Sequence, residues 1–134
     1  NYQASNNRSQ LIKTKHNHII ADCYNANPTS TLAALKSFIN TKHEKKLVIL
    51  GDMLELGNQE EKEHQQIVDY LTKNNLNSIL VGKCFQKFKS NFICFEETAF
   101  LIKYFQENEF KNYLILLKGS RGIKLESIIN QNVI

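Results

Sequence analysis

Short apolar runs alternate with longer segments of helical hydrophobic spacing along most of this chain, and few folds accommodate such a pattern. The apolar runs occupy residues 17–23, 46–51, 77–82, 91–95 and 112–118. Between them, apolar side chains recur three or four positions apart, for example at Ile67, Val68 and Leu71, as on the buried stripe of an amphipathic helix. Strands that are apolar throughout are covered on both faces, which is typical of parallel sheets. We therefore predict an α/β fold: a Rossmann-like, doubly wound, mostly parallel sheet of five to six strands with helices on both faces.

The chain has 134 residues, which is enough for one domain with a buried core. Residues 1–16 are polar and show no hydrophobic period, so we assign them to a linker. We assign residues 17–134 to the folded domain.

Composition and charge exclude several classes of protein. The net charge of +4 is mild and the lysines are scattered, so we expect no nucleic-acid partner. The apolar runs are far shorter than a membrane span, and no basic-then-apolar leader opens the chain; we therefore expect no membrane association and a cytoplasmic location. Three cysteines without CxxC spacing and four histidines without an HExxH pattern indicate reduced thiols and no metal site.

Polar and glycine-rich segments follow the predicted strands. Along the chain they read DCYNANP, GDMLELG, GKC, EET and KGSRG. The carboxyl ends of parallel strands meet at one edge of the sheet, where open α/β folds bind their ligands. That edge is therefore where we expect a site.

The DCYNANP segment combines a helix start with residues that a helix start does not need. Asn27 suits an N-cap and Pro28 suits the first helical position. Asp22 and Asn25 precede the cap and remain unexplained by it. A carboxylate at this place can hold ribose hydroxyls or a cation, and it can equally be a solvated loop residue.

The KGSRG segment offers Lys118, Ser120 and Arg121 as charged or hydroxyl donors. Its two glycines allow backbone amides to approach a ligand, and a helix follows, so the combination suits a carboxylate or a phosphate. A flexible basic turn explains the same residues.

The GDMLELG segment forms the turn between a strand and a helix, where we expect Gly51 and Gly57 to supply positive φ. Met53, Leu54 and Leu56 are apolar at positions where a loop without a packing role is usually polar, so we expect them to pack against another part of the protein. We interpret His64, in the following helix, as a surface or half-buried residue and not as a catalyst. No GxxxxGK[ST] loop occurs in the chain, so the chain is not a complete P-loop enzyme.

Three segments together, DCYNANPTSTLAAL, LVILGDMLELG followed by EEKEHQQI, and LLKGSRGIKLE, resemble in order the C-terminal domain of the Mur ligases. The resemblance runs from about Asn6 to about Glu126, and YNANP is its most discriminating part. It implies a three-domain enzyme of peptidoglycan synthesis, and hence of cell-wall formation, cell shape and division. Residues 1–16 then correspond to the tail of a central ATPase domain, and the absent P-loop belongs to that domain.

The resemblance also implies roles for individual residues. The nucleotide-binding residues are Arg8, Asp22, Tyr24 and Asn25. The residues that bind the incoming dipeptide are Asn25, Ala26, Asn27, Lys118, Ser120 and Arg121. No catalytic residue lies in this domain alone, so we expect the isolated domain to be inactive.

YNANP is similar to the branch of the family that joins D-alanyl-D-alanine to UDP-N-acetylmuramoyl tripeptide. The reaction so implied uses ATP and Mg²⁺, both held mainly by the central domain, and passes through an acyl phosphate that the dipeptide amine attacks. Besides these ligands, the implied partners are the other domains of the same chain.

Three alternatives remain open from the sequence. The domain can belong to a ligase of the same superfamily that adds another amino acid. Asp22, Asp52 and Lys118 together are similar to the acids and lysine of a receiver-like, phosphate-accepting signalling module. A stand-alone adenine-nucleotide binder is the third reading.

Overall fold

The computed structural model describes residues 9–23 and 25–134. Within these residues, six strands form one sheet in the order β1-β2-β6-β3-β4-β5. The strands are β1 (Gln10–Lys13), β2 (His18–Asp22), β3 (Lys46–Gly51), β4 (Ser78–Val81), β5 (Ile93–Phe95) and β6 (Leu114–Lys118). All neighbouring pairs are parallel except β1 with β2. The predicted α/β class and mostly parallel sheet are confirmed.

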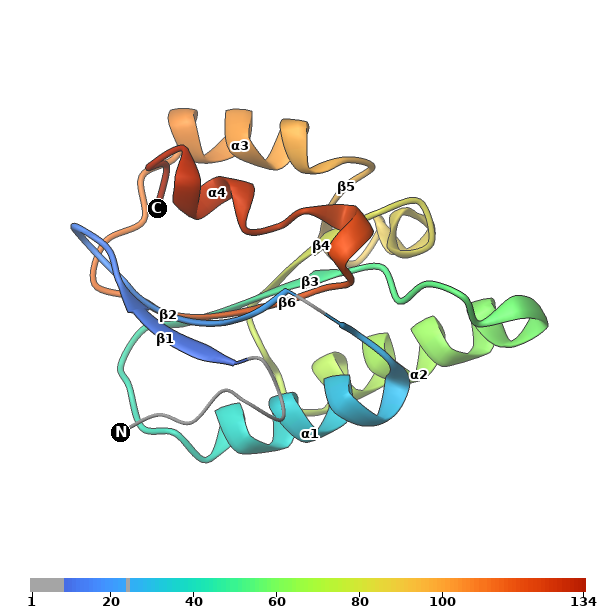
Figure 1. The fold of residues 1–134 in the computed structure, drawn as a ribbon. Coiled ribbons are helices and arrows are strands. Elements are labelled where there is room, and N and C mark those ends of the chain that lie inside the picture. The colour runs from blue at the N-terminus through green and yellow to red at the C-terminus, as the bar shows by residue number, and fades with distance from the viewer. Residues whose placement is uncertain (1–8, 24) are drawn as a thin grey trace.

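In the part of the chain that the structure describes, four α-helices cover both faces of this sheet. They are α1 (Pro28–Ile39), α2 (Glu60–Lys73), α3 (Thr98–Glu107) and α4 (Ser127–Asn130), with the short 3-10 helices η1 (Gly57–Gln59), η2 (Phe85–Phe88) and η3 (Arg121–Ile123) between them. Helices α1 and α2 lie on one face, and α3 and α4 lie on the other (Figure 1). Within the described residues, no helix combines the length and apolarity needed to cross a bilayer.

Each face of the sheet has its own core, because alternate side chains of a strand point to opposite faces. Leu47 and Ile49 of β3 pack into the cluster on the α3 and α4 side. Val48 and Leu50 pack into the cluster on the α1 and α2 side. All four are essentially buried, and burial of such a side chain contributes about 1.5–3 kcal/mol. A strand that stabilises two cores has no polar face, which is why KLVILG reads as an unbroken apolar run.

The expectation that residues 1–16 form a linker is wrong for Gln10–Lys13. These residues form β1, which pairs antiparallel with β2 from Gln10 opposite Ala21 to Lys13 opposite His18. The strand escapes sequence patterning because it lies at the sheet edge, where Leu11 is 59% exposed. An edge strand with solvent on one face does not need an apolar run.

Strand β6 lies between β2 and β3, although it is the last strand in the chain. In the register, Lys118 at the end of β6 pairs with Asp22 of β2 on one side and with Leu50 of β3 on the other. The segments that follow these three strands therefore emerge side by side at the carboxyl edge of the sheet. This position is the one at which open α/β sheets bind ligands.

Candidate functional site

A buried ion pair joins the ends of β2 and β6. The Lys118 ammonium lies 2.7 Å from Asp22 Oδ2 and donates a second hydrogen bond of 2.8 Å to the Asn25 carbonyl. Lys118 is 2% exposed and Asp22 is 6% exposed. The pair therefore lies in the protein interior, where an ionised group needs a partner to remain charged.

Only one oxygen of the Asp22 carboxylate is occupied by protein within the described residues. Oδ2 accepts from Lys118 and, at 3.4 Å, from the Ser9 hydroxyl. Oδ1 is buried and has no hydrogen-bond partner. Asp22 also lines a cavity of about 240 Å³ between β2 and α1, together with Ser9, Ser30 and Ala33. A buried carboxylate oxygen without a partner is a site at which an O–H or N–H donor of a ligand is favoured.

The segment after Asp22 leads directly into α1. The Asn27 side chain accepts from the Ser30 amide at 2.8 Å, and the Asn27 amide donates to Ser30 Oγ at 3.2 Å. With Pro28 as the first helical residue, this arrangement is a capping box with proline at N1. The expected helix-start role of Asn27 is confirmed, and Ser30 is the partner that the sequence did not reveal.

The other residues of DCYNANP have different surroundings. Asn25 is exposed and Ala26 is buried, so Asn25 is the one whose side chain is available to a ligand. Arg8 and Tyr24, both expected at the nucleotide, lie outside the residues that the structure describes.

The KGSRG segment is held against the segment that follows β3. Ser120 Oγ donates to the Asp52 carbonyl at 3.1 Å, and Ser120 is largely buried. A Cβ on Gly119 would lie 3.2 Å from Gly51 Cα and 2.8 Å from Leu125 Cδ1, so glycine is required for this approach. Arg121 begins η3 and is exposed. Among Lys118, Ser120 and Arg121, only Arg121 presents its side chain to solvent.

Gly51 does not have the positive φ that we expected of it. Positive φ is found at Gly57 (58°) and Gly82 (127°). Gly51 is the last residue of β3, and a Cβ there would lie 2.9 Å from Ile123 Cγ2. The role of Gly51 is therefore close packing against the segment after β6. Of the two glycines in GDMLELG, Gly57 is the one with positive φ.

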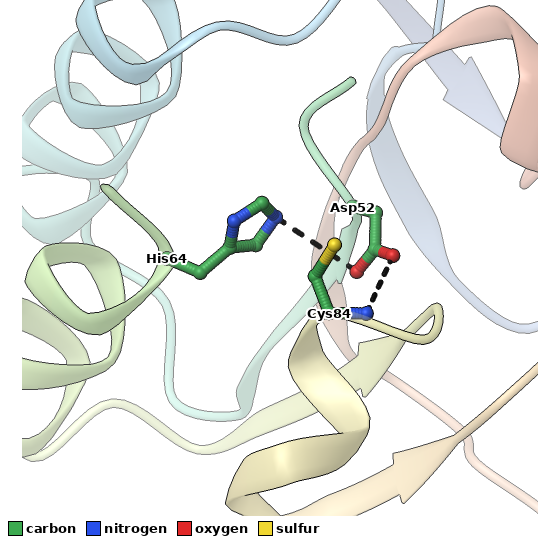
Figure 2. A group of neighbouring side chains, drawn as sticks. All are labelled: Asp52, His64 and Cys84. Atoms are coloured by element: carbon green, nitrogen blue, oxygen red, sulfur yellow. Dashed lines mark hydrogen bonds and ion pairs between the residues drawn. The ribbon is translucent and has the colours of Figure 1, made fainter. Parts of the chain in front are cut away.

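Asp52, His64 and Cys84 form a second polar cluster at the carboxyl edge, shown in Figure 2. The Asp52 carboxylate accepts the Cys84 amide at 2.8 Å on Oδ2 and the Phe85 amide at 3.0 Å on Oδ1. Asp52 thus caps the start of η2 and ties the segment after β3 to the segment after β4.

His64 completes this second cluster. Its Nε2 accepts the Met53 amide at 3.0 Å, and its Nδ1 lies 2.7 Å from the Glu60 carbonyl. This pairing requires a neutral ring with the proton on Nδ1. His64 is 1% exposed, so our interpretation of it as a surface or half-buried residue is wrong. His64 instead links α2 to the segment after β3 from a buried position.

Met53 is buried, as expected, whereas Leu54 is 44% exposed.

The second cluster does not fit a metal ion. Both Asp52 oxygens and His64 Nε2 already accept backbone amides. Burial, a hydrogen bond that the thiol donates to the Glu60 carboxylate and the charge of Asp52 raise the pKa of Cys84 to about 12, and a protonated thiol is a poor metal ligand. The same occupied oxygens do not suit Asp52 as a phosphate acceptor.

Cys23 faces the opposite side of the sheet from Asp22. Its thiol contacts the Leu117 carbonyl at 3.9 Å and packs against the α3 and α4 core. Burial and the charges of Glu126 and Asp22 raise the pKa of Cys23 to about 12. The Cys23 side chain therefore lies on the α3 and α4 side of the sheet.

The fold and the three motifs define a class of protein. A family model described as "Mur ligase, glutamate ligase domain" matches residues 7–121. The chain belongs to this family, which confirms the resemblance drawn from the motifs and rules out a receiver-like module.

Curated proteins from several bacteria are similar to this chain over most of its length. The UDP-N-acetylmuramoyl-tripeptide–D-alanyl-D-alanine ligase of Bacillus subtilis (strain 168) is 37% identical over 134 residues, covering 91% of this chain and 29% of that protein. The ligase of the same name from Rickettsia prowazekii (strain Madrid E) is 29% identical and covers 92% of this chain and 29% of that protein. This chain therefore spans less than a third of the length of these curated relatives.

Solved structures agree in fold. A crystal structure of MurF from Acinetobacter baumannii matches with a TM-score of 0.80 and 27% identity, covering 98% of this chain and 30% of that one. MurF ligase from Thermotoga maritima, in complex with ADP, matches with a TM-score of 0.77 and 22% identity, covering 95% of this chain and 30% of that one. At that identity the second match supports the fold alone.

Proposed function

We propose that this chain is the C-terminal domain of an ATP-dependent ligase that joins D-alanyl-D-alanine to UDP-N-acetylmuramoyl tripeptide. The observation that carries the proposal is the meeting of DCYNANP and KGSRG at one edge of the sheet. There, an unpartnered carboxylate oxygen of Asp22 and an exposed guanidinium of Arg121 flank the ends of β2 and β6. The names of the curated relatives from Bacillus and Rickettsia support this choice of acceptor and amine.

The nucleotide occupies the Asp22 side of the edge in this proposal. Asp22 Oδ1 accepts a ribose hydroxyl of ATP, because it is buried and otherwise unpaired. Arg8, Tyr24 and Asn25 are the further nucleotide contacts that we propose from the family pattern.

The dipeptide lies toward the KGSRG segment in the same proposal. Arg121 receives its carboxylate, because a guanidinium forms two parallel hydrogen bonds with a carboxylate. The Asn25 side chain, the backbone of Ala26 and Asn27, and Ser120 complete this subsite.

The reaction proceeds in two transfers. The γ-phosphoryl group of ATP moves to the terminal carboxylate of the tripeptide, which gives an acyl phosphate and ADP. The dipeptide amine attacks that carbonyl carbon, the C–N bond forms, and phosphate leaves. The residues of this chain orient the two reactants and exclude water that would hydrolyse the acyl phosphate.

Mg²⁺, when bound, neutralises phosphate charge in such a reaction. We propose that the other domains of the same protein hold Mg²⁺ and most of the ATP, because the one cluster of candidate ligands among the described residues is already satisfied by backbone amides. The cytoplasm, where ATP and reduced thiols occur together, is the location that we propose.

The test measures ADP release by the intact ligase with UDP-N-acetylmuramoyl tripeptide present, with and without D-alanyl-D-alanine. We expect release that depends on the dipeptide. Release that depends on a single amino acid would show that the domain belongs to another ligase of the superfamily. We also expect no ADP release from the 134-residue chain by itself.

Replacement of Asp22 tests the nucleotide assignment. In the intact ligase, Asp22→Asn removes the charge of the carboxylate at the ribose, and we expect the apparent KM for ATP to rise about tenfold, which is what loss of a charge-assisted hydrogen bond produces. The KM for the dipeptide should change less than twofold. An unchanged KM for ATP would contradict the ribose assignment.

A further inference from the structure

The buried Lys118 ammonium stands at the junction of the two segments that form the candidate site. It joins Asp22 Oδ2 at 2.7 Å and the Asn25 carbonyl at 2.8 Å. The Gly119 amide, one residue further, donates to the Asp22 carbonyl at 3.3 Å. Three contacts thus fasten the end of β6 to both sides of Cys23 in the neighbouring segment.

The stability of the fold does not by itself explain a charged pair at this place. Transfer of a lysine and an aspartate from water to the interior is unfavourable, and their attraction barely offsets it. Apolar residues of similar size serve stability equally well at such positions. What the pair supplies, and apolar residues do not, is a defined orientation of the carboxylate and of the Asn25 backbone.

We propose that Lys118 is a positioning residue for the nucleotide side of the site and does not bind the dipeptide itself. This inference rests on the proposed function. Lys118 occupies Oδ2 of Asp22 and so leaves Oδ1 as the oxygen available to a ribose hydroxyl. Through the Asn25 carbonyl it also fixes the residues that precede the Asn27 cap.

The burial of Lys118 argues against direct contact with a substrate carboxylate. Its side chain is 2% exposed, and the carboxylate nearest to its ammonium is that of Asp22. The ammonium already donates to Asp22 and to the Asn25 carbonyl, and its burial leaves little surface for a dipeptide carboxylate to reach. Arg121, on the same segment, is exposed.

The first experiment replaces Lys118 in the intact ligase with methionine, which keeps the length of the side chain and removes the ammonium. We expect Lys118→Met to raise the apparent KM for ATP about tenfold, as loss of one oriented charged contact does, with a smaller rise of about threefold or less in the KM for D-alanyl-D-alanine, whose subsite shares Asn25. Lys83→Met is the matched control, because Lys83 is exposed at the same edge. A tenfold rise in the dipeptide KM with an unchanged ATP KM would overturn the proposal.

A double-mutant cycle separates action through Asp22 from an independent contact. In the Asp22→Asn background, we expect Lys118→Met to raise the ATP KM further by less than about threefold, because the oriented carboxylate is already lost. Two effects that multiply in full would overturn the proposal.

Hydrogen exchange tests the positioning role without any catalytic readout. The amides of Gly119, Ser30 and Thr31 donate to Asp22 and to the Asn27 cap. We expect these three amides to exchange at least about tenfold faster in Lys118→Met and at the wild-type rate in Lys83→Met. Unchanged protection would overturn the inference even if the wild-type ligase is active. If Lys118→Met loses protection but the wild-type ligase releases no ADP, the positioning role is supported and the proposed function is contradicted.

Discussion

Two buried aspartates at the carboxyl edge, Asp22 after β2 and Asp52 after β3, have opposite relations to the protein around them. Asp52 gives both oxygens to backbone amides of Cys84 and Phe85. Asp22 gives one oxygen to Lys118 and keeps the other unpartnered within the described residues. The first carboxylate is fully satisfied by the backbone and holds the fold together, whereas the second leaves one oxygen without a protein partner among the described residues. Burial of an acidic side chain therefore does not by itself identify a binding site.

The packing around Asp52 leaves no room for an extra methyl group, and Gly82→Ala is the strongest test of this half of the comparison. The new Cβ would lie 2.2 Å from Asp52 Cγ, at a φ of +127°. We expect a loss of about 4 kcal/mol in the free energy of unfolding, measured by urea denaturation, from strain and overpacking together. Gly57→Ala, with positive φ and no atom near its Cβ, should lose only about 1 kcal/mol. Equal losses would contradict the close packing.

Removal of the Asp52 carboxylate should have the next largest effect. Asp52→Ala leaves the amides of Cys84 and Phe85 without an acceptor, and unsatisfied buried donors destabilise by about 1–3 kcal/mol each. We expect urea denaturation to show a loss of about 3 kcal/mol, with a smaller loss in Asp52→Asn, which keeps an acceptor oxygen. Asp69→Ala, on the exposed face of α2, is the control. A loss below about 1 kcal/mol for Asp52→Ala would remove the distinction between the two aspartates.

The cap of α1 separates stability from binding within the DCYNANP segment. We expect Asn27→Ala to lower the free energy of unfolding by about 1 kcal/mol, and Asn27→Ser to lower it by a few tenths, because serine retains the capping acceptor. If Asn27 also contacts the dipeptide through its side chain, Asn27→Ser will raise the dipeptide KM while stability is nearly kept. Parallel changes in both measurements would assign Asn27 to the helix start alone.

The Asp22–Lys118 pair should contribute least to stability. We expect the double variant Asp22→Leu/Lys118→Met to change the free energy of unfolding by less than about 1 kcal/mol, because apolar residues replace a buried pair with little loss. ADP release by the intact ligase should nevertheless fall. A stability loss as large as that of Asp52→Ala would show that Asp22, like Asp52, mainly stabilises the fold.

Strands β3, β4 and β6, whose residues are buried on both faces, were the most plainly marked in the sequence. KLVILG marks β3 without error because each residue from Leu47 to Gly51 is buried. The QLIK strand was missed because an edge strand with an exposed Leu11 carries no such mark. Local patterns also do not specify strand order, so the insertion of β6 beside β2, and with it the Asp22–Lys118 pair, required the structure.

Predictions at the candidate site succeeded where a residue acts locally and stopped where partners are distant in sequence. The Asn27 cap depends on Ser30, only three positions away. His64 was misjudged because its partner is the amide of Met53, across a turn that has no periodic pattern. The outward position of Arg121 and the inward positions of Lys118 and Ser120 depend on tertiary packing, and KGSRG alone does not distinguish them.

The position of β6 has a consequence for how this protein is made. Strands β2 and β3 both pair with β6, so the edges that they turn toward each other stay unpaired until residues 114–118 insert between them. Because β6 is the last strand in the chain, the ribosome synthesises the other five strands first. During that interval β2 and β3 lack their shared partner strand, and unpaired strand edges with exposed apolar residues are prone to aggregate.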